Sequence, residues 1–295
     1  MKAIYVPKGA ALEYARLATN PYLTCEHGCR YCYVPGVLHM TRDVFCRPPV
    51  LREGYLEALE RELPDYSLDA GNSDPIHIGF VCDPYSPGED GQTRQVLEAF
   101  VRHNVPFTLL TKGGMRAVRD FDLLQGHAAS LGVTMTGCES TRMEWEPGAA
   151  PVSDRERSLV VAHEAGIPTW VSIEPVLVPE EALWLIGDLP RCFGVDEIRV
   201  GRVNHLASMD SALVENYGLR DVDWTAFANM AYDALVASGV ERFTLKRGLV
   251  ELLDEQRAEG YRELHQGEAS ADAPGAAGGA AGAAAEGSAE PCHLN

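Results

Sequence analysis

The sequence is poor in lysine and in positive charge overall. Only four of its 25 basic residues are lysines, and the 295-residue chain carries a formal net charge of −18. Tight non-specific binding to nucleic acid depends on many phosphate contacts from cations, so this balance argues against a self-sufficient duplex-binding protein. A local basic groove is still compatible with the composition.

Long apolar runs and leader signals are also missing. No stretch of about 18 consecutive apolar residues occurs, so no transmembrane helix is expected. Residues 1–12 lack the charged and apolar regions of a secretory signal peptide. We therefore expect a cytoplasmic protein that has no membrane partner.

The eight cysteines are too unevenly spaced for a disulfide framework. Cys25, Cys29 and Cys32 stand in one short loop, while the other five are isolated. The isolated cysteines are expected to be mostly small buried hydrophobic residues. Because no second cysteine cluster follows, an auxiliary iron–sulfur domain is not expected.

Three thiolates in one loop can bind three irons of a [4Fe–4S] cube and leave the fourth iron without a protein ligand. An open iron can take a substrate or a cofactor. A structural zinc site is the alternative, and it needs a fourth ligand close by. Candidates for that ligand are His27, His39 and Cys46.

Strands and helices alternate regularly after residue 75. Short, nearly all-apolar segments separated by amphipathic helices are typical of a parallel sheet that is covered on both faces or closed into a barrel. The predicted strands are 76–81, 106–111, 133–137, 169–173, 197–200 and 242–245. The predicted helices are 51–63, 93–101, 116–125, 153–165, 180–186, 224–237 and 249–258. Ser153 and Glu156 are expected to form a capping box.

Polar and ionisable side chains gather just after the predicted strands. In parallel α/β folds the chemistry lies at the C-terminal ends of the strands, so this asymmetry indicates one working face. The residues at these ends include Cys82, Asp83, Tyr85, Lys112, Thr136, Cys138, Glu174, Arg202, Asn204 and His205. A local cationic rim is expected from Arg199, Arg202, Lys246 and Arg247.

We expect one folded domain over residues 1–265. Its core spans about 20–205, and a C-terminal extension covers about 206–265. Residues 266–295 are rich in Ala and Gly and cannot bury enough apolar surface to offset their ordering entropy. This tail is therefore expected to be disordered.

The motif Cys25-x3-Cys29-x2-Cys32-Tyr33 resembles the signature of radical S-adenosylmethionine (SAM) enzymes. Further segments resemble the spore photoproduct lyase-like branch of that superfamily, which is also called DNA repair photolyase-like. These segments are 20–22, His27, 79–89, 110–112, 145–148, 163–168 and 172–175.

The resemblance implies an α/β fold, a partial (β/α)6 TIM-like barrel of parallel strands. The iron–sulfur loop would follow the first strand, and a C-terminal extension of helices and a strand would complete the chain. It also implies a [4Fe–4S] cluster and SAM, reductive cleavage of SAM, and hydrogen abstraction from substrate by a 5′-deoxyadenosyl radical. The reaction class, whether lyase, isomerase or transferase, stays open. An electron donor such as flavodoxin or ferredoxin is the implied partner.

The same resemblance implies roles for five residues around SAM. Tyr33 is expected near the adenine, Asp83 at the amino group and Lys112 at the carboxylate. Thr136 and Glu174 are expected to face the ribose or the substrate. Each of these side chains could instead be an ordinary packing, turn or loop residue.

Two cysteines are candidates for returning a hydrogen atom to the substrate radical. Cys82 is the first candidate, although the position of the family's donor falls two residues earlier, at Phe80. Since residues two apart on a strand share a face, Cys82 could substitute for it. A buried strand cysteine is the alternative, and Cys138 is the second candidate.

Three functions are compatible with these patterns. The first is a radical SAM enzyme that repairs or modifies a nucleobase in DNA or RNA, which rests on family analogy. The second is a radical SAM enzyme for a small metabolite or peptide, and the third a non-catalytic zinc or iron–sulfur protein. Substrate contacts are expected from Tyr85, Arg202, Asn204 and His205, and a flipped base would need aromatic residues such as Tyr85, Trp145 and Trp170.

Overall fold

The structure is a computed structural model that describes residues 1–271. The chain divides into two units, the first covering Met1–Leu252 and the second beginning at Leu253. In its described part the second unit consists of one helix, α12 (Glu255–Ala271). The predicted disordered tail begins within this helix, and its residues 272–295 lie outside the described residues. Within residues 1–271, no helix combines the length and the hydrophobicity needed to cross a lipid bilayer.

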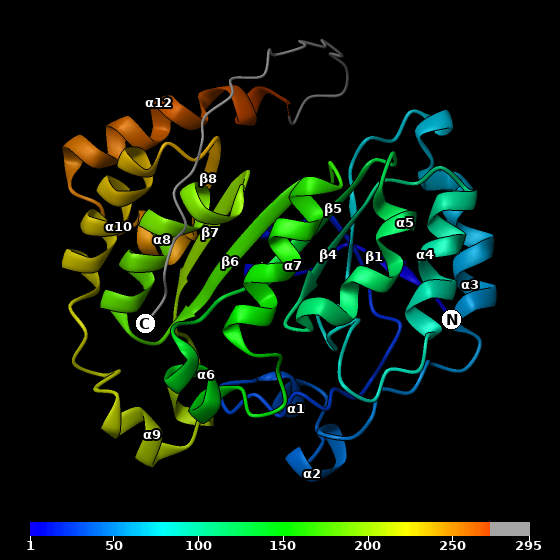
Figure 1. The fold of residues 1–295 in the computed structure, drawn as a ribbon, viewed down its shortest axis with the longest axis horizontal. Coiled ribbons are helices and arrows are strands. Elements are labelled where there is room, and N and C mark those ends of the chain that lie inside the picture. Colours follow the sequence, from blue (N-terminus) through cyan, green and yellow to red (C-terminus); the bar gives the residue numbers. More distant parts are fainter. Residues whose placement is uncertain (272–295) are drawn as a thin grey trace. The chain divides into compact units, whose positions relative to one another are not determined.

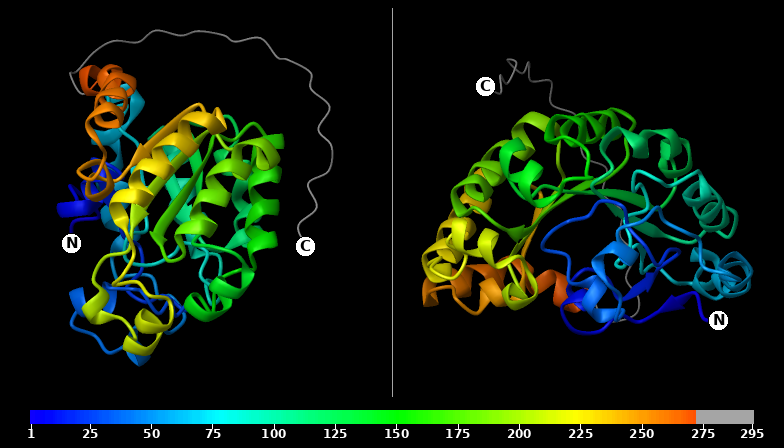
Figure 2. Two further views of the ribbon diagram at one scale, coloured as in Figure 1. Left: turned by 90° about the vertical axis from the view of Figure 1, so that its left-hand side faces the viewer. Right: turned by 90° about the horizontal axis from the view of Figure 1, so that it is seen from below.

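One eight-stranded sheet organises the first unit, with the strands in sequence order from β1 to β8. β1 (Ile4–Tyr5) pairs antiparallel with β2 (Leu17–Thr19), and β2 through β8 run parallel to one another. The sheet is curved but not closed (Figure 2, right). The remaining strands are β3 (Ile76–Ile78), β4 (Phe107–Thr111), β5 (Ala129–Thr134), β6 (Thr169–Val176), β7 (Glu197–Arg202) and β8 (Arg242–Leu245).

The longer helices cover the outer face of this sheet (Figures 1 and 2). They are α3 (Tyr55–Glu62), α4 (Gln92–Arg102), α7 (Val152–Glu164), α8 (Pro179–Phe193) and α10 (Trp224–Ser238). Shorter helices are α1 (Val34–Val37), α2 (Arg42–Phe45), α5 (Phe121–Leu124), α6 (Glu139–Trp145), α9 (Ser211–Asn216) and α11 (Arg247–Val250). The 3-10 helices are η1 (Gly9–Glu13), η2 (Leu63–Tyr66), η3 (Leu68–Ala70), η4 (Gly114–Asp120) and η5 (Leu206–Ser208).

The core lies between the sheet and these helices. On α4 the side chains of Val96, Leu97 and Phe100 are buried, which is the one-sided stripe that an amphipathic helix presents to a sheet. The Phe100 ring packs edge-on against Phe107 of β4, with ring centroids 5.5 Å apart. This packing on the outer face leaves the C-terminal ends of the strands free to carry a site.

The predicted fold class is confirmed, since β2–β7 supply six parallel strands and β8 belongs to the C-terminal extension. The cysteine loop follows β2, the first strand of the parallel series. β2 is only three residues long and lies in an N-terminal segment of mixed composition, so the sequence pattern does not predict it as a strand.

One predicted strand is too long. The strand expected over 76–81 ends at Ile78, because Gly79 has a φ of +99° and turns the chain. A Cβ at Gly79 would lie 2.6 Å from the carbonyl oxygen of Cys82, so the turn is open only to glycine. Phe80 and Cys82 therefore lie in a loop, and the argument that placed them on one strand face is wrong.

Other local expectations also need correction. The capping box of Ser153 and Glu156 does not form: α7 begins at Val152, whose N–H donates to the carboxylate of Glu139 at 2.8 Å. β5 spans Ala129–Thr134 rather than 133–137, and Gly132 lies within it against the Trp170 ring. The helix expected over 249–258 is interrupted between α11 and α12.

Candidate functional site

A cavity of about 430 Å³ lies at the C-terminal edge of the sheet, beside the cysteine loop. Most of the predicted site residues line it, and these are Cys25, Cys29, Cys32, Tyr33, Cys82, Asp83, Lys112, Glu174, Arg202, Asn204 and His205. Thr136, Cys138 and Tyr85 do not line it. The fold thus brings these residues from five separate segments to one cavity, while the chemical role of each stays a prediction.

The cysteine loop is fixed largely through its backbone. The N–H of Cys25 donates to the Phe45 carbonyl at 3.0 Å, and the N–H of Cys32 donates to the Cys29 carbonyl at 3.0 Å. The guanidinium of Arg42 donates to three carbonyls of the loop, those of Cys29 at 2.9 Å, Arg30 at 2.8 Å and Cys32 at 3.0 Å. A single side chain of α2 therefore holds the turn that carries two of the three cysteines.

The segment Trp145–Gly148, which is one of the segments that carry the family resemblance, also holds the cysteine loop in place. The N–H of Arg30 donates to the Trp145 carbonyl at 2.8 Å, and the N–H of Gly148 donates to the His27 carbonyl at 2.9 Å. A Cβ at Gly148 would lie 2.6 Å from the Glu26 carbonyl oxygen. Glycine is thus required here because the two backbones touch.

A buried charged network stands behind this clamp. The Glu146 carboxylate accepts hydrogen bonds from the Tyr31 hydroxyl and from Arg155, and both Glu146 and Arg155 are almost fully buried. Arg155 also donates to the Thr134 carbonyl at 2.8 Å, which ties the network to β5. Burial alone would raise the pKa of Glu146, but Arg155 and Lys112 hold it below its usual value. Removing either partner would leave an uncompensated buried charge.

His27 lies between the first two cysteines and pairs with Asp83. Its Nε2 is 3.0 Å from Oδ2 of Asp83, and its Nδ1 is 3.1 Å from the Gly148 carbonyl oxygen. Burial by itself lowers the pKa of His27, but the Asp83 carboxylate outweighs burial and raises it. Because both ring nitrogens have partners, His27 is not available as a metal ligand.

Asp83 accepts from three further donors. The N–H of Tyr85 at 2.8 Å and the Thr111 hydroxyl at 2.6 Å reach Oδ1, and the N–H of Lys112 reaches Oδ2 at 2.6 Å. The ion pair with His27 adds a fourth polar contact to these three hydrogen bonds. The predicted contact of Asp83 with the amino group of SAM would therefore have to share an oxygen that is already bonded. Its evident role is to join the cysteine loop to the end of β4.

The three clustered cysteines are free thiols on one cavity wall. The pKa of Cys25 is lowered to about 5, chiefly by a hydrogen bond from the Cys82 thiol, and burial raises that of Cys32 to about 11. Within residues 1–271, no three Cys, His, Asp or Glu side chains converge on one point as the ligands of a single ion do. A [4Fe–4S] cube binds each cysteine to a different iron, so three cysteines of one loop that all line the same cavity are the donor set such a cluster requires.

Cys82 faces the cysteine loop. Its side chain is buried, and its Sγ lies 3.3 Å from the Asp83 carbonyl oxygen as well as beside the Cys25 sulfur. Cys138 is exposed at the start of α6, where its Sγ is 3.1 Å from the Glu181 carboxylate. Of the two predicted hydrogen donors, Cys82 is thus at the cavity and Cys138 is not.

Lys112 follows β4 and lines the cavity, with Nζ 5.8 Å from the centroid of the Tyr31 ring. Burial lowers the pKa of Lys112, but Cys29 and the carboxylates of Glu146 and Asp83 outweigh it and raise the value. Lys112 is therefore a persistent cation beside the cysteines, as the predicted contact with a carboxylate requires.

Glu174 lies within β6 and is held by a tyrosine that the sequence patterns did not single out. Tyr14 donates its hydroxyl to Glu174 and also contacts the Ser172 hydroxyl at 2.8 Å. The Nζ of Lys246 lies 3.3 Å from the centroid of the Tyr14 ring. Tyr14 is separated from Glu174 by 160 residues, and no periodic pattern in the leader foretells the contact.

Three of the four predicted substrate residues, Arg202, Asn204 and His205, line the cavity, and His205 meets Tyr33, which is predicted at the adenine of SAM. The rings of Tyr33 and His205 lie 5.3 Å apart, so two distant loops meet here. Tyr85 is instead fully buried under Arg119, whose guanidinium carbon is 5.5 Å from the ring centroid. Trp145 and Trp170 are also buried and do not line the cavity. None of the three aromatic residues expected around a flipped base is placed to stack on one there.

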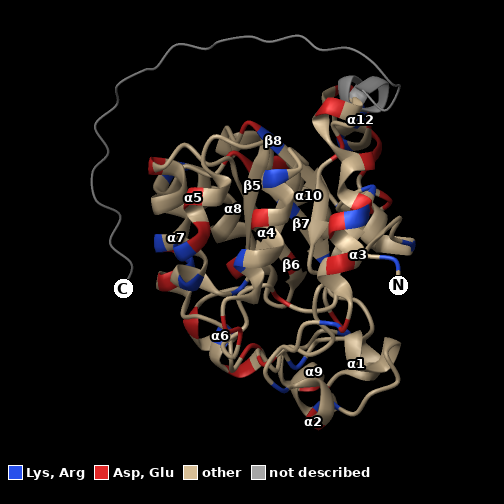
Figure 3. Ribbon diagram, turned by 90° about the vertical axis from the view of Figure 1, so that its right-hand side faces the viewer, with Lys and Arg blue, Asp and Glu red and all other residues tan. Residues whose placement is uncertain are grey.

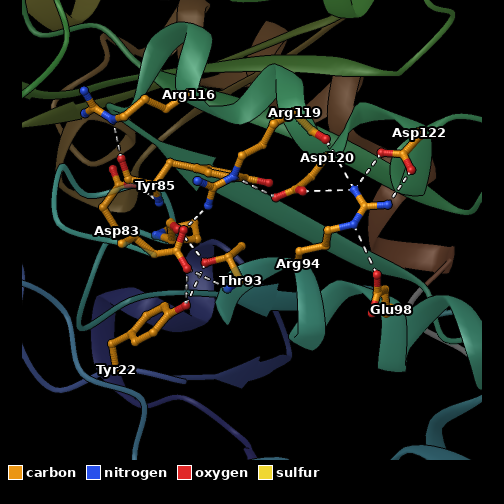
Figure 4. Close-up of polar contacts among 12 residues, drawn as sticks. Tyr22, Asp83, Tyr85, Thr93, Arg94, Glu98, Arg116, Arg119, Asp120 and Asp122 are labelled. Carbon is orange, nitrogen blue, oxygen red and sulfur yellow. Dashed lines mark hydrogen bonds and ion pairs between the residues drawn. The ribbon is translucent and has the colours of Figure 1, made fainter. Parts of the chain in front are cut away.

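Figure 4 shows the polar network that fixes the loop after β3. The Glu89 carboxylate accepts from the Tyr22 hydroxyl at 3.2 Å, from the Thr93 N–H at 2.8 Å and from the Arg119 guanidinium. Tyr22 directly precedes the cysteine loop, while Thr93 is on α4 and Arg119 is on η4. The loops that carry Asp83 and the cysteines are therefore anchored to the same helices.

Thr136 is buried, and within the described residues its hydroxyl has no hydrogen-bond partner.

The residues of the expected cationic rim differ in whether they have an acidic partner. Arg199 pairs with Glu197 at 2.5 Å and Arg247 with Glu251 at 2.7 Å, whereas Arg202 has no such partner among the side chains that the structure describes. The candidates for a fourth zinc ligand do not join the cysteines either, since His27 is bonded elsewhere and His39 and Cys46 do not line the cavity.

No model of a known protein family matches the sequence. An uncharacterized protein of Methanocaldococcus jannaschii is 24% identical over 167 residues, which is 55% of this chain and 61% of that protein. The chain thus spans less than two thirds of the length of this curated relative.

Solved structures show the same fold at low identity. Spore photoproduct lyase complexed with dinucleoside spore photoproduct gives a TM-score of 0.60 at 12% identity, covering 82% of this chain and 79% of that one. SuiB of Streptococcus suis bound to S-adenosylmethionine gives 0.57 at 12% identity, covering 77% of this chain and 49% of that one. SuiB bound to the precursor peptide SuiA gives 0.53 at 13% identity, with coverages of 84% and 50%. The chain therefore has the open α/β barrel fold of these radical SAM enzymes, with spore photoproduct lyase matched over most of both chains.

Proposed function

We propose that this protein is a radical SAM enzyme in which Cys25, Cys29 and Cys32 hold a [4Fe–4S] cluster. The observation that carries the proposal is the convergence of these three free thiols with Lys112 on one cavity, at the end of a sheet with the radical SAM fold. When bound, the cluster and SAM would supply a 5′-deoxyadenosyl radical. Flavodoxin or ferredoxin is the proposed electron donor, and the cytoplasm the proposed location.

The residues of the chain have distinct tasks in this proposal. Arg42, His27 and the Trp145–Gly148 segment fix the cysteine loop, which keeps the three thiols at the spacing that the cluster needs. Lys112 presents a cation to the carboxylate of SAM, and Tyr33 covers its adenine. Glu174, with Tyr14 behind it, provides a carboxylate for a ribose hydroxyl or for the substrate.

For the substrate, the proposal names only a chemical class. The fold shared with spore photoproduct lyase supports a nucleobase, while the fold shared with SuiB in complex with SuiA supports a peptide. Because the chain is strongly acidic, a nucleotide or another small molecule fits it better than a long duplex does. Cys82 lies beside Cys25, which favours a contact with the cluster ligand, and its role as a hydrogen donor remains a prediction.

Anaerobic reconstitution with iron and sulfide tests the proposal. We expect a brown protein that, with SAM and a strong reductant, releases 5′-deoxyadenosine and methionine. Cys29→Ala should lose the cluster, whereas Cys46→Ala should keep it, because Cys46 does not line the cavity. A colourless protein that retains one zinc, and loses it in Cys46→Ala, would establish the non-catalytic alternative instead.

A further inference from the structure

Cations gather at this cavity although the chain carries a net charge of −18. Lys8, Lys112 and Arg202 line the cavity, and Lys246 lies beside it over the Tyr14 ring. Three of the four lysines of the sequence are thus at one place. On the helices of the same unit, basic and acidic residues are interspersed on the face drawn in Figure 3. The concentration of cations is a property of the cavity rather than of the surface.

The carboxylates of the cavity do not neutralise these cations fully. Asp83 is occupied by His27 and by three donors of the loop and strand ends. Glu174 accepts from Tyr14, and the positive charge that acts on it most strongly is that of Lys246. Neither carboxylate is in ion-pair range of Lys8 or of Arg202 within the part of the chain that the structure describes.

Arg202 is the most distinctive of the cations. Its side chain is half-buried at the end of β7, and among residues 1–271 its guanidinium has neither an ion pair nor a hydrogen bond. It lies against Gly248, where a Cβ would be only 3.0 Å from its Nε. Its own carbonyl accepts from the Asn204 amide at 3.1 Å, which fixes the backbone on the cavity side. A half-buried guanidinium with no partner among the described residues has its donors available for a ligand.

We propose that the substrate carries an oxyanion, a phosphate or a carboxylate, that Arg202 binds. This inference rests on the proposed function, since it places the substrate in the cavity that the cluster and SAM would share. The planar guanidinium fork matches two oxygens of either group. Lys8 contributes a second charge from the segment between β1 and η1, at the other edge of the open sheet. Lys112 stays reserved for the carboxylate of SAM.

A nucleotide would bring a phosphate, and a small metabolite would bring a carboxylate. Inorganic phosphate and acetate are therefore the two probes, titrated into the full chain carrying its cluster and an excess of SAM. Line broadening of the ³¹P signal and of ¹³C-labelled acetate gives each Kd. The variants are Arg202→Gln, Arg202→Lys and the control Arg157→Gln, which replaces an exposed arginine of α7 outside the cavity.

We expect Arg202→Gln to raise the Kd of the bound probe at least tenfold, Arg202→Lys to recover part of the loss, and Arg157→Gln to match wild type. Tighter binding of phosphate would indicate a nucleotide-like substrate, and tighter binding of acetate a carboxylic acid. Binding of neither probe by wild type, or equal binding by Arg202→Gln, would overturn the proposal. Release of 5′-deoxyadenosine is measured on the same samples, so a failure of the radical function is seen separately from a failure of the anion site.

Discussion

The imidazole of His27 and the carboxylate of Asp83 form a buried pair, with Nε2 and Oδ2 3.0 Å apart. His27 belongs to the cysteine loop, and Asp83 to the loop after β3, 56 residues later in the sequence. The pair lowers the pKa of Asp83 despite burial, so the carboxylate is charged at any physiological pH. It connects the ligands of the proposed cluster to the sheet that positions them.

Replacement of Asp83 by asparagine should destabilise the protein strongly. Asp83→Asn keeps the shape but removes the charge that His27 faces, and breaking a buried pair in this way costs roughly 3–5 kcal/mol. Urea denaturation should show a lower free energy of unfolding. The control Asp122→Asn removes an exposed carboxylate that pairs with Arg94 and should have little effect. A small effect of Asp83→Asn would mean that the pair is not structural.

Replacement of Arg42 should affect the cluster rather than the fold. Arg42→Ala removes three hydrogen bonds to loop carbonyls, so we expect less iron per chain after reconstitution and faster loss of colour under a chelator. Arg42→Lys should restore part of the iron, because an ammonium group also donates to carbonyls. Arg47→Ala, which removes an exposed arginine nearby, should keep the wild-type iron content. Equal iron in Arg42→Ala and wild type would contradict this role.

Lys112 should govern the affinity for SAM. Lys112→Ala removes the cation proposed to meet the SAM carboxylate, and a hydrogen bond to a charged group is worth about 1.5–3 kcal/mol. Calorimetric titration should therefore show a Kd for SAM raised about tenfold or more, with the cluster absorbance unchanged. Lys112→Arg keeps the charge and should lose less. A wild-type Kd in Lys112→Ala would remove Lys112 from the SAM site.

Lys246 should leave a signature in the pH dependence of stability. Burial, opposed by Glu174, lowers its pKa from 10.5 to about 8. Between these pH values the unfolded chain holds the proton and the folded protein does not, so wild-type stability gains with rising pH. The free energy of unfolding of Lys246→Met relative to wild type should thus be highest below pH 8 and fall toward pH 10.5, by roughly 3 kcal/mol at most.

Denaturation of both proteins at several pH values measures that difference. Lys2→Met is the control for the loss of one exposed lysine. A difference between Lys246→Met and wild type that stays constant across the window would show that Lys246 is not desolvated in the folded protein.

The sequence predicts those parts of the site whose chemistry depends on residue type and spacing. The cysteine triplet, the alternation of strands and helices, and the position of Lys112 after β4 all follow from local patterns, and the structure brings them to one cavity. Glu146 and Arg155 have no such pattern, because their pairing depends on how α6 and α7 pack. The segment that contains Glu146 was nevertheless visible as a family-like motif.

Tyr14 and Arg42 show a different limit. Each acts through a long-range or irregular contact, with Tyr14 reaching β6 and Arg42 reaching backbone carbonyls. Every residue has a backbone carbonyl, so the sequence does not indicate which carbonyls accept hydrogen bonds from a side chain. The apolar pattern also fails to predict the early end of β3, because the apolar run continues past Gly79 while the backbone turns there.

The cavity carries two kinds of residue. The groups around the cysteines are interlocked, because His27, Asp83 and Glu146 each satisfy several partners. Lys8 follows β1 and Arg202 ends β7, and neither side chain has an ion pair or a hydrogen bond among the described residues. Mutations of Lys8 and Arg202 should change which substrates the cavity binds without disturbing the proposed cluster and SAM sites. Directed evolution of a new substrate specificity should therefore start at these two positions.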